Sequence, residues 1–154
     1  MALERLQALG LQLPSPTMAI ANYLPYQIVE HEIYVSGQLP LRDGQVVYQG
    51  LLGDELTVAE GYQAARLCAL SALGQIASAA GSLENIQIIR VGGFVASAAG
   101  FTEQSQVLNG ASDLLVAVLG ERGRHARVAV GVAALPRNAA VEVEIMARII
   151  AGTD

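Results

Sequence analysis

The sequence predicts an α+β fold in which two long helices pack on one face of a mostly antiparallel sheet. Three observations point to this fold. The expected elements follow the order β-β-α-β-α-β-β, both long helical segments place apolar residues at intervals of three and four, and the last two strands alternate. Helices that link the strands of such a sheet lie on one side of it and give a two-layer sandwich. With 154 residues, the chain has about the length of one domain.

The first third of the chain is expected to hold a short helix and a β-hairpin. Leucines at helical spacing indicate a helix over residues 2–9. Alternating residues indicate a strand over 26–39, and residues 45–48 are expected to return as its partner. Asp43-Gly44 between them supplies the positive φ that a tight turn needs. The leucines of the short helix are Leu3, Leu6 and Leu9.

Two long helices follow, each with a candidate N-cap. Thr57 with Glu60 three residues later has the pattern of a capping box. A β-branched strand over 85–95 separates this helix from the second, for which Thr102 is the expected N-cap. The inward residues of the first helix are Val58, Tyr62, Ala65, Ala69, Ala72, Leu73, Ile76 and Ala80. Those of the second are Val107, Leu108, Ala111, Leu114, Leu115 and Val118.

The last two strands, 127–135 and 140–150, are expected to pair as a terminal hairpin. Because side chains alternate between the faces of a strand, this pair divides into an apolar face and a mixed face. We expect the apolar face to seat the helices and the mixed face to contact another subunit. The apolar face holds Val128, Val130, Val132, Val141, Val143, Ile145 and Ile149. The mixed face holds Arg127, Ala129, Gly131, Ala133, Glu142, Glu144, Met146 and Arg148.

The composition argues against several classes of function. Hydrophobic residues make up 53% of the chain and charged residues 15%, which excludes a disordered protein. A net charge of −5 and nine scattered basic residues argue against nucleic acid as a partner. No apolar stretch reaches the roughly 18 residues of a membrane span. Because the first residues also lack the pattern of a signal peptide, we expect a cytoplasmic protein with no membrane partner.

Metal and cofactor motifs are not found in the sequence. The single cysteine, Cys68, lies in a helical pattern and is expected to be a buried, inert thiol. His31 and His125 have no partner at metal-ligand spacing. The glycine motifs of nucleotide-binding proteins and the serine motif of hydrolases are absent as well. We therefore expect neither a metal nor a cofactor.

Arg127 is the first candidate functional residue, because a guanidinium grips a carboxylate with two parallel hydrogen bonds. The alternative is a salt bridge to Glu142 or Glu144 across the expected hairpin. These two glutamates point the same way, and a carboxylate in a partly dry cleft can orient or activate water. The alternative for them is an ion pair with an arginine of a neighbouring subunit.

Two further segments hold candidate ligand-binding groups. Ser36-Gly37-Gln38, at the end of a strand, offers a hydroxyl and a backbone amide, or simply ends the strand. Tyr23 and Tyr26 flank a proline in an extended segment. They either form the wall of a pocket or are ordinary core or surface aromatic residues.

Four short motifs resemble the RidA/YjgF family of reactive intermediate (imine) deaminases. They are the Ser-Gly-Gln-Leu-Pro run at 36–40, the Ala-Arg-Val-Ala-Val run at 126–130, the Leu-Pro pair at 135–136 and the Val-Glu-Val-Glu run at 141–144. The similarity covers roughly residues 20 to 150. It implies a chorismate-mutase-like fold and a homotrimer with a small-molecule cleft between adjacent subunits.

The resemblance also implies roles for individual residues. Arg127 matches the arginine that binds the carboxylate of a 2-imino or 2-keto acid. Glu142 matches the glutamate that positions the attacking water. The position two after the arginine, often Cys or Thr in the family, is Ala129. The positions we assign to substrate binding are Tyr23 (alternatively Tyr26), Ser36, Gly37, Asn109, Val128 and Ala129.

The function that the resemblance implies is hydrolytic deamination of small 2-imino acids to 2-keto acids, without a cofactor. A second hypothesis is a non-catalytic trimeric protein that binds small carboxylate metabolites. A third, suggested by the family's older label, is an endoribonuclease. Residues 1–154 are expected to form one domain with residues 1–19 as an N-terminal extension. The extension and the longer loop 96–101 are typical of a longer branch of the family.

Overall fold

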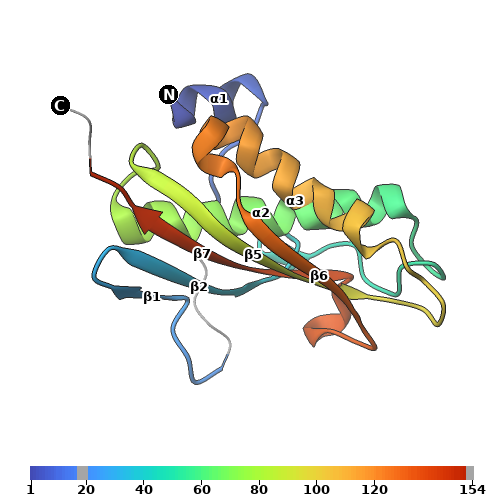
Figure 1. The fold of residues 1–154 in the computed structure, drawn as a ribbon. Helices are drawn as coiled ribbons and strands as arrows, with labels where there is room; N and C mark the ends of the chain where they lie inside the picture. Colours follow the sequence, from blue (N-terminus) through green and yellow to red (C-terminus); the bar gives the residue numbers. More distant parts are fainter. Residues whose placement is uncertain (17–20, 152–154) are drawn as a thin grey trace.

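The computed structural model describes residues 1–16 and 21–151, which form a two-layer α+β sandwich as predicted (Figure 1). Two long helices lie side by side on one face of a five-stranded sheet with the order β1-β2-β7-β5-β6. The helices are α1 (Ala2–Ala8), α2 (Val58–Ala80) and α3 (Gln104–Leu119). The strands of this sheet are β1 (Tyr26–Val29), β2 (Glu32–Gln38), β5 (Ile86–Ala96), β6 (Ala126–Val132) and β7 (Val141–Ile149). A separate ribbon is formed by β3 (Leu41–Arg42) and β4 (Gln45–Val46).

The pairing of the last two strands differs from the prediction. The strands β6 and β7 do not form a hairpin, because β5 lies between them and pairs parallel with β6 and antiparallel with β7. The chain from β5 through α3 to β6 is a crossover connection, which places its two strands side by side and parallel. Alternation within a strand carries no information about its neighbour, so the sequence pattern did not reveal this order.

The faces of β6 are also the reverse of the predicted ones. Val128 and Val130 are 38% and 40% exposed on the face without helices, the open face, while Arg127 and Ala129 face α3. Glu142 lies on the open face too, because its β5 partner is also the partner of Val130. Small apolar residues occupy both sides of β6, so period two could not show which side is buried.

The turns near the N-terminus were predicted in part. The expected strand over 26–39 is itself a hairpin, in which β1 and β2 are joined at Glu30, a residue with φ of 54°. The Asp43-Gly44 turn is confirmed between β3 and β4, with φ of 52° and 77°. Two consecutive positive φ values are those of the tight turn that Asp-Gly favours.

The start of α2 is as predicted, whereas the start of α3 is not. The side chain of Thr57 accepts the Glu60 amide at 3.2 Å, the Glu60 carboxylate accepts the Thr57 amide at 3.1 Å, and Gly81 ends the helix in the left-handed region. Thr102 does not cap α3, which begins at Gln104 without a side-chain cap. The helix α1 buries Leu6, but Leu3 and Leu9 point largely into solvent.

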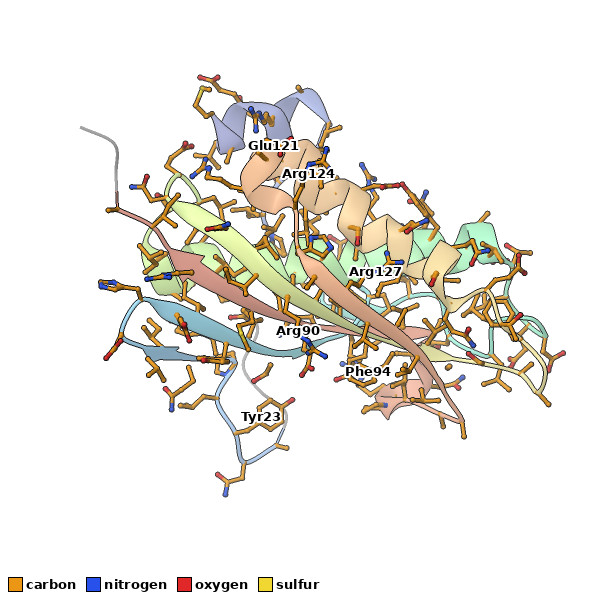
Figure 2. All side chains as sticks on the ribbon, viewed as in Figure 1. Tyr23, Arg90, Phe94, Glu121, Arg124 and Arg127 are labelled. Atoms are coloured by element: carbon orange, nitrogen blue, oxygen red, sulfur yellow. The ribbon has the colours of Figure 1, made fainter. Side chains whose placement is uncertain are left out.

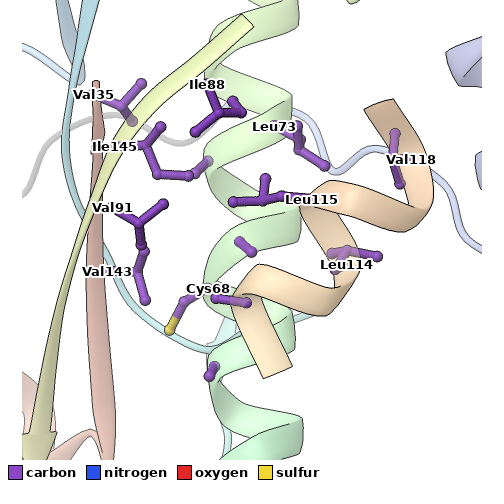
Figure 3. Close-up of a cluster of buried hydrophobic side chains, with 14 of the residues drawn as sticks. Val35, Cys68, Leu73, Ile88, Val91, Leu114, Leu115, Val118, Val143 and Ile145 are labelled. Carbon is purple, nitrogen blue, oxygen red and sulfur yellow. The ribbon is translucent and has the colours of Figure 1, made fainter. Parts of the chain in front are cut away.

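The core lies between the two helices and the sheet (Figure 3). Cys68 is fully buried there, as predicted, and burial raises the pKa of its thiol well above the ordinary value. The two helices touch at Gly110 of α3, where a Cβ atom would overlap the backbone carbonyl of Tyr62 in α2. Only glycine allows this close approach. Among the described helices, none is long and apolar enough to span a membrane.

Candidate functional site

The Arg127 side chain lies along α3 and is held there by three hydrogen bonds. Its Nη1 donates to Oδ1 of Asn109 at 2.9 Å and to Oγ of Ser112 at 3.2 Å, and its Nη2 donates to the backbone carbonyl of Ser105 at 3.3 Å. Asn109 and Ser112 are three residues apart and therefore share a helix face. Figure 2 shows Arg127 where β6 passes α3. The structure thus brings together two of the predicted residues, Arg127 and Asn109.

The guanidinium of Arg127 has N–H groups left for a ligand. An arginine carries five N–H donors, and three bonds to described residues leave the Nε–H and one Nη2–H. The residue is only half-buried. The predicted alternative, a salt bridge to Glu142 or Glu144, is wrong. Arg127 makes no ion pair with residues 1–16 or 21–151, and both glutamates lie on the other face of the sheet.

Ser112 continues the hydrogen-bonded chain to a histidine that sequence reasoning did not assign to the site. Its Oγ lies 2.8 Å from Nε2 of His125, and Nδ1 of the same ring lies 2.6 Å from the carbonyl oxygen of Gly123. His125 precedes Arg127 by two residues and lies directly before β6. That spacing was the one available signal, and it was not distinctive.

Glu142 occupies the open face, in the middle of the sheet on β7. Its side chain is half-buried and forms no hydrogen bond or ion pair with the described residues. Burial raises the pKa of this carboxyl, and the nearby Glu144 raises it further. A Cβ atom at Gly37 of β2 would overlap the Glu142 carboxylate. Gly37 therefore makes the space in which this carboxylate lies.

Glu144 and Ser36 are two other predicted polar residues on this face. Glu144 pairs with Arg90 at 3.8 Å, an exposed ion pair (Figure 2 labels Arg90). The Ser36 hydroxyl donates to the carbonyl of Leu24 at 2.5 Å and ties the loop before β1 to β2. Glu144 and Ser36 both line a shallow hollow of about 360 Å³ on this side of the sheet.

The aromatic residues near this hollow have different environments. Tyr23 is 49% exposed in the loop before β1, away from Arg127 (Figure 2). Tyr26 packs against the hydrophobic core, although it also borders the hollow. Tyr34, which the sequence analysis did not single out, lines the hollow and donates its hydroxyl to Glu32 at 2.6 Å. This bond raises the pKa of the Tyr34 hydroxyl.

The predicted site residues therefore form two groups on opposite faces of the sheet. Arg127, Asn109 and Ala129 lie on the helix side, and Ala129 packs against the core. The second group lies on the open side and consists of Glu142, Gly37, Ser36 and Val128. One chain does not bring Arg127 and Glu142 together. No group of three or more His, Cys, Asp or Glu side chains in the described part of the chain is arranged to hold a metal ion.

Comparison with known proteins decides the family. The family model described as "YjgF/chorismate_mutase-like, putative endoribonuclease" matches residues 3–149. The chain belongs to the RidA/YjgF family. Its fold is therefore the chorismate-mutase-like fold that the sequence motifs predicted.

Several RidA/YjgF relatives are similar over nearly the whole chain. Protein TCP17 of Trypanosoma cruzi is 47% identical over 146 residues, which cover 94% of this chain and 91% of that protein. A crystal structure of a protein of unknown function from Agrobacterium tumefaciens is 45% identical, with a TM-score of 0.90 over 97% of this chain and 92% of that one. A "putative endoribonuclease" from Shewanella oneidensis is 41% identical, with a TM-score of 0.94 over 97% and 99%.

Proposed function

We propose that this chain catalyses the hydrolytic deamination of small reactive 2-imino acids to 2-keto acids, in clefts between the subunits of a homotrimer. The observation that carries the proposal is Arg127. Its own chain holds the guanidinium in place, and two N–H groups remain to bind a carboxylate. In a 2-imino acid the carboxylate is bonded directly to the imine carbon, so this anchor fixes the position of the reacting atom.

The reaction needs a water molecule and a proton acceptor. The oxygen of water adds to the imine carbon while one of its protons passes to the carboxylate of Glu142, which then gives this proton to the imine nitrogen. In the carbinolamine that results, the hydroxyl proton passes to the nitrogen by the same route, the C–N bond breaks, and ammonia leaves the 2-keto acid while Glu142 is again a carboxylate. A raised pKa makes the Glu142 carboxylate a better proton acceptor at neutral pH.

Contact between two copies of the chain would complete the cleft. Arg127 and Glu142 lie on opposite faces of one sheet, and Arg127 belongs to the edge strand β6. A second copy packed with its open face against this edge would place its Glu142 group toward the Arg127 of the first. The open face has the exposed apolar character of such a contact surface. Its exposed or half-exposed apolar side chains are Tyr34, Phe94, Val128, Val130 and Met146.

The proposal is tested with an imine generated in the assay by an amino acid oxidase. We expect wild-type protein to accelerate ammonia release, and Arg127→Ala to reduce the acceleration roughly 100-fold without changing the sedimentation of the assembly. Arg124→Ala is the matched control, because Arg124 is exposed and pairs only with Glu121 among the described residues. Full activity of Arg127→Ala would overturn the assignment of the site.

The same assay separates the other two functions. A non-catalytic protein that binds small carboxylate metabolites would bind a 2-keto acid through Arg127 without accelerating ammonia release. An endoribonuclease would cut RNA, an activity named in the descriptions of the family and of one relative. The net charge of −5 disfavours binding of a phosphate backbone.

A further inference from the structure

We propose that Ser112 and His125 are positioning residues that orient the Arg127 guanidinium for its carboxylate ligand. The inference rests on the proposed function for the identity of that ligand. Its structural basis is a continuous chain of hydrogen bonds from the Gly123 carbonyl, through His125 and Ser112, to Arg127 and Asn109.

The donor and acceptor of each hydrogen bond in this series follow from its two ends, the Gly123 carbonyl and the Arg127 guanidinium. A backbone carbonyl only accepts, so Nδ1 of His125 carries a proton and donates it to Gly123. In the neutral ring, Nε2 then has no proton and accepts the hydroxyl proton of Ser112. The Ser112 oxygen keeps its lone pairs for Nη1 of Arg127, which only donates. His125 thus prevents the Ser112 hydroxyl from turning its proton toward the guanidinium.

The Gly123 end of this series of hydrogen bonds is fixed by packing. Gly123 is buried, and a Cβ atom there would overlap the Leu115 carbonyl of α3. The carbonyl that accepts from His125 is therefore held against the same helix that carries Ser112 and Asn109. Ser112, Asn109 and this carbonyl are thus all positioned by α3.

Asn109 alone would leave the guanidinium less constrained. With Ser112, both protons of Nη1 have protein partners, and the Ser105 carbonyl takes one from Nη2. The ligand therefore meets the remaining Nε–H and Nη2–H in one fixed orientation. A preorganised group loses less conformational entropy when the ligand binds, so the expected benefit is in substrate affinity.

The test compares Ser112→Ala, which removes the hydroxyl, with Ser112→Thr, which keeps it. We expect Ser112→Ala to raise KM about five- to tenfold with kcat changed less than about twofold, and Ser112→Thr to restore KM. His125→Phe keeps a ring but cannot accept from Ser112, and we expect it to resemble Ser112→Ala. Ser78→Ala, on the exposed side of α2, is the control for the same substitution elsewhere. An unchanged KM in Ser112→Ala, beside an active wild type, would overturn the inference and leave the proposed function standing.

A second measurement needs no substrate. Nitrogen-15 NMR follows the rotation of the Arg127 guanidinium about its Nε–Cζ bond, with the signal assigned through Arg127→Lys. We expect slow rotation in the wild type and faster rotation in Ser112→Ala and His125→Phe. Equal rates in all three would overturn the positioning role. If the wild type instead neither hydrolyses imines nor binds 2-ketobutyrate, the proposed function fails, and the rotation rates alone decide the positioning role.

Discussion

The Arg127 side and the Glu142 side of the molecule differ in how their charged groups are satisfied. The guanidinium makes three hydrogen bonds to α3, and one of its partners is itself held by a histidine. The carboxylate makes none with the described residues and lies in the space that Gly37 leaves open. One charge is thus positioned by its own chain, whereas the other has no partner among residues 1–16 and 21–151 and is free to interact with water, a ligand or a second copy. We infer that the first sets binding and the second sets reactivity.

The largest effect is expected from Glu142→Gln. Because the amide cannot accept the proton of the attacking water, kcat should fall roughly 100-fold. Affinity for 2-ketobutyrate should be unchanged, since Arg127 still binds the carboxylate. Steady-state kinetics measure kcat and calorimetry measures the affinity. Glu121→Gln is the matched control, because Glu121 is exposed and pairs with Arg124. Loss of affinity with unchanged kcat would assign Glu142 to binding instead.

Asn109→Ala is expected to change KM, and not kcat. Removal of Oδ1 takes away the shortest bond that Arg127 makes, and KM should rise about tenfold while kcat changes little. Steady-state kinetics with the imine substrate test this. If kcat falls and KM is unchanged, Asn109 acts on the reacting atoms and not through Arg127.

Gly37→Ala tests whether packing alone positions the carboxylate. The new methyl group would overlap the Glu142 side chain, so the free energy of unfolding should fall by about 1 kcal/mol. The loss should disappear in the double variant Gly37→Ala/Glu142→Ala, because the overlapping group is then absent. Denaturant unfolding of the wild type, the two single variants and the double variant gives this double-mutant cycle. A loss that persists in the double variant would mean that Gly37 has another role.

The smallest effect is a pH dependence of stability. Burial raises the pKa of Glu142 in the folded state, so the folded state binds more protons than the unfolded state in the range between the two pKa values. The contribution of Glu142 to stability is therefore most favourable at acidic pH and decreases as pH rises through that range. Against Glu142→Gln, the wild type should lose a few tenths of a kcal/mol between about pH 4 and pH 7. The same pH dependence of the free energy of unfolding in the wild type and in Glu142→Gln would contradict this.

Local patterns predicted what depends on local chemistry. The capping box of α2 and the Asp43-Gly44 turn are each determined by residues adjacent in sequence, and both are confirmed. The place of β6 depends on a crossover through α3, and the small residues on both sides of Val128 and Ala129 gave no sign of which side is buried. The alternative predicted for Arg127, a salt bridge to Glu142 or Glu144, is wrong for the same reason.

The family motifs named the two charged residues but not what surrounds them. Ser112 and His125 are ordinary residues at ordinary spacing, and they acquire a role only because α3 lies beside β6. Glu142 is recognisable from its motif. It has no partner among the described residues because it lies on the open face, which no helix covers. Contacts between distant segments decide both features, and a single sequence does not display them.

The close approach at Gly110 links the packing of α3 against α2 to the position of the residues that hold Arg127. This glycine directly follows Asn109 and lets α3 sink against the carbonyl of Tyr62. A methyl group there would lift α3 away from α2 and carry Asn109 and Ser112 with it, relative to a guanidinium rooted in the sheet. Under the proposed function, the placement of the groups that orient Arg127 therefore depends on the absence of a Cβ atom at Gly110, where α3 contacts α2.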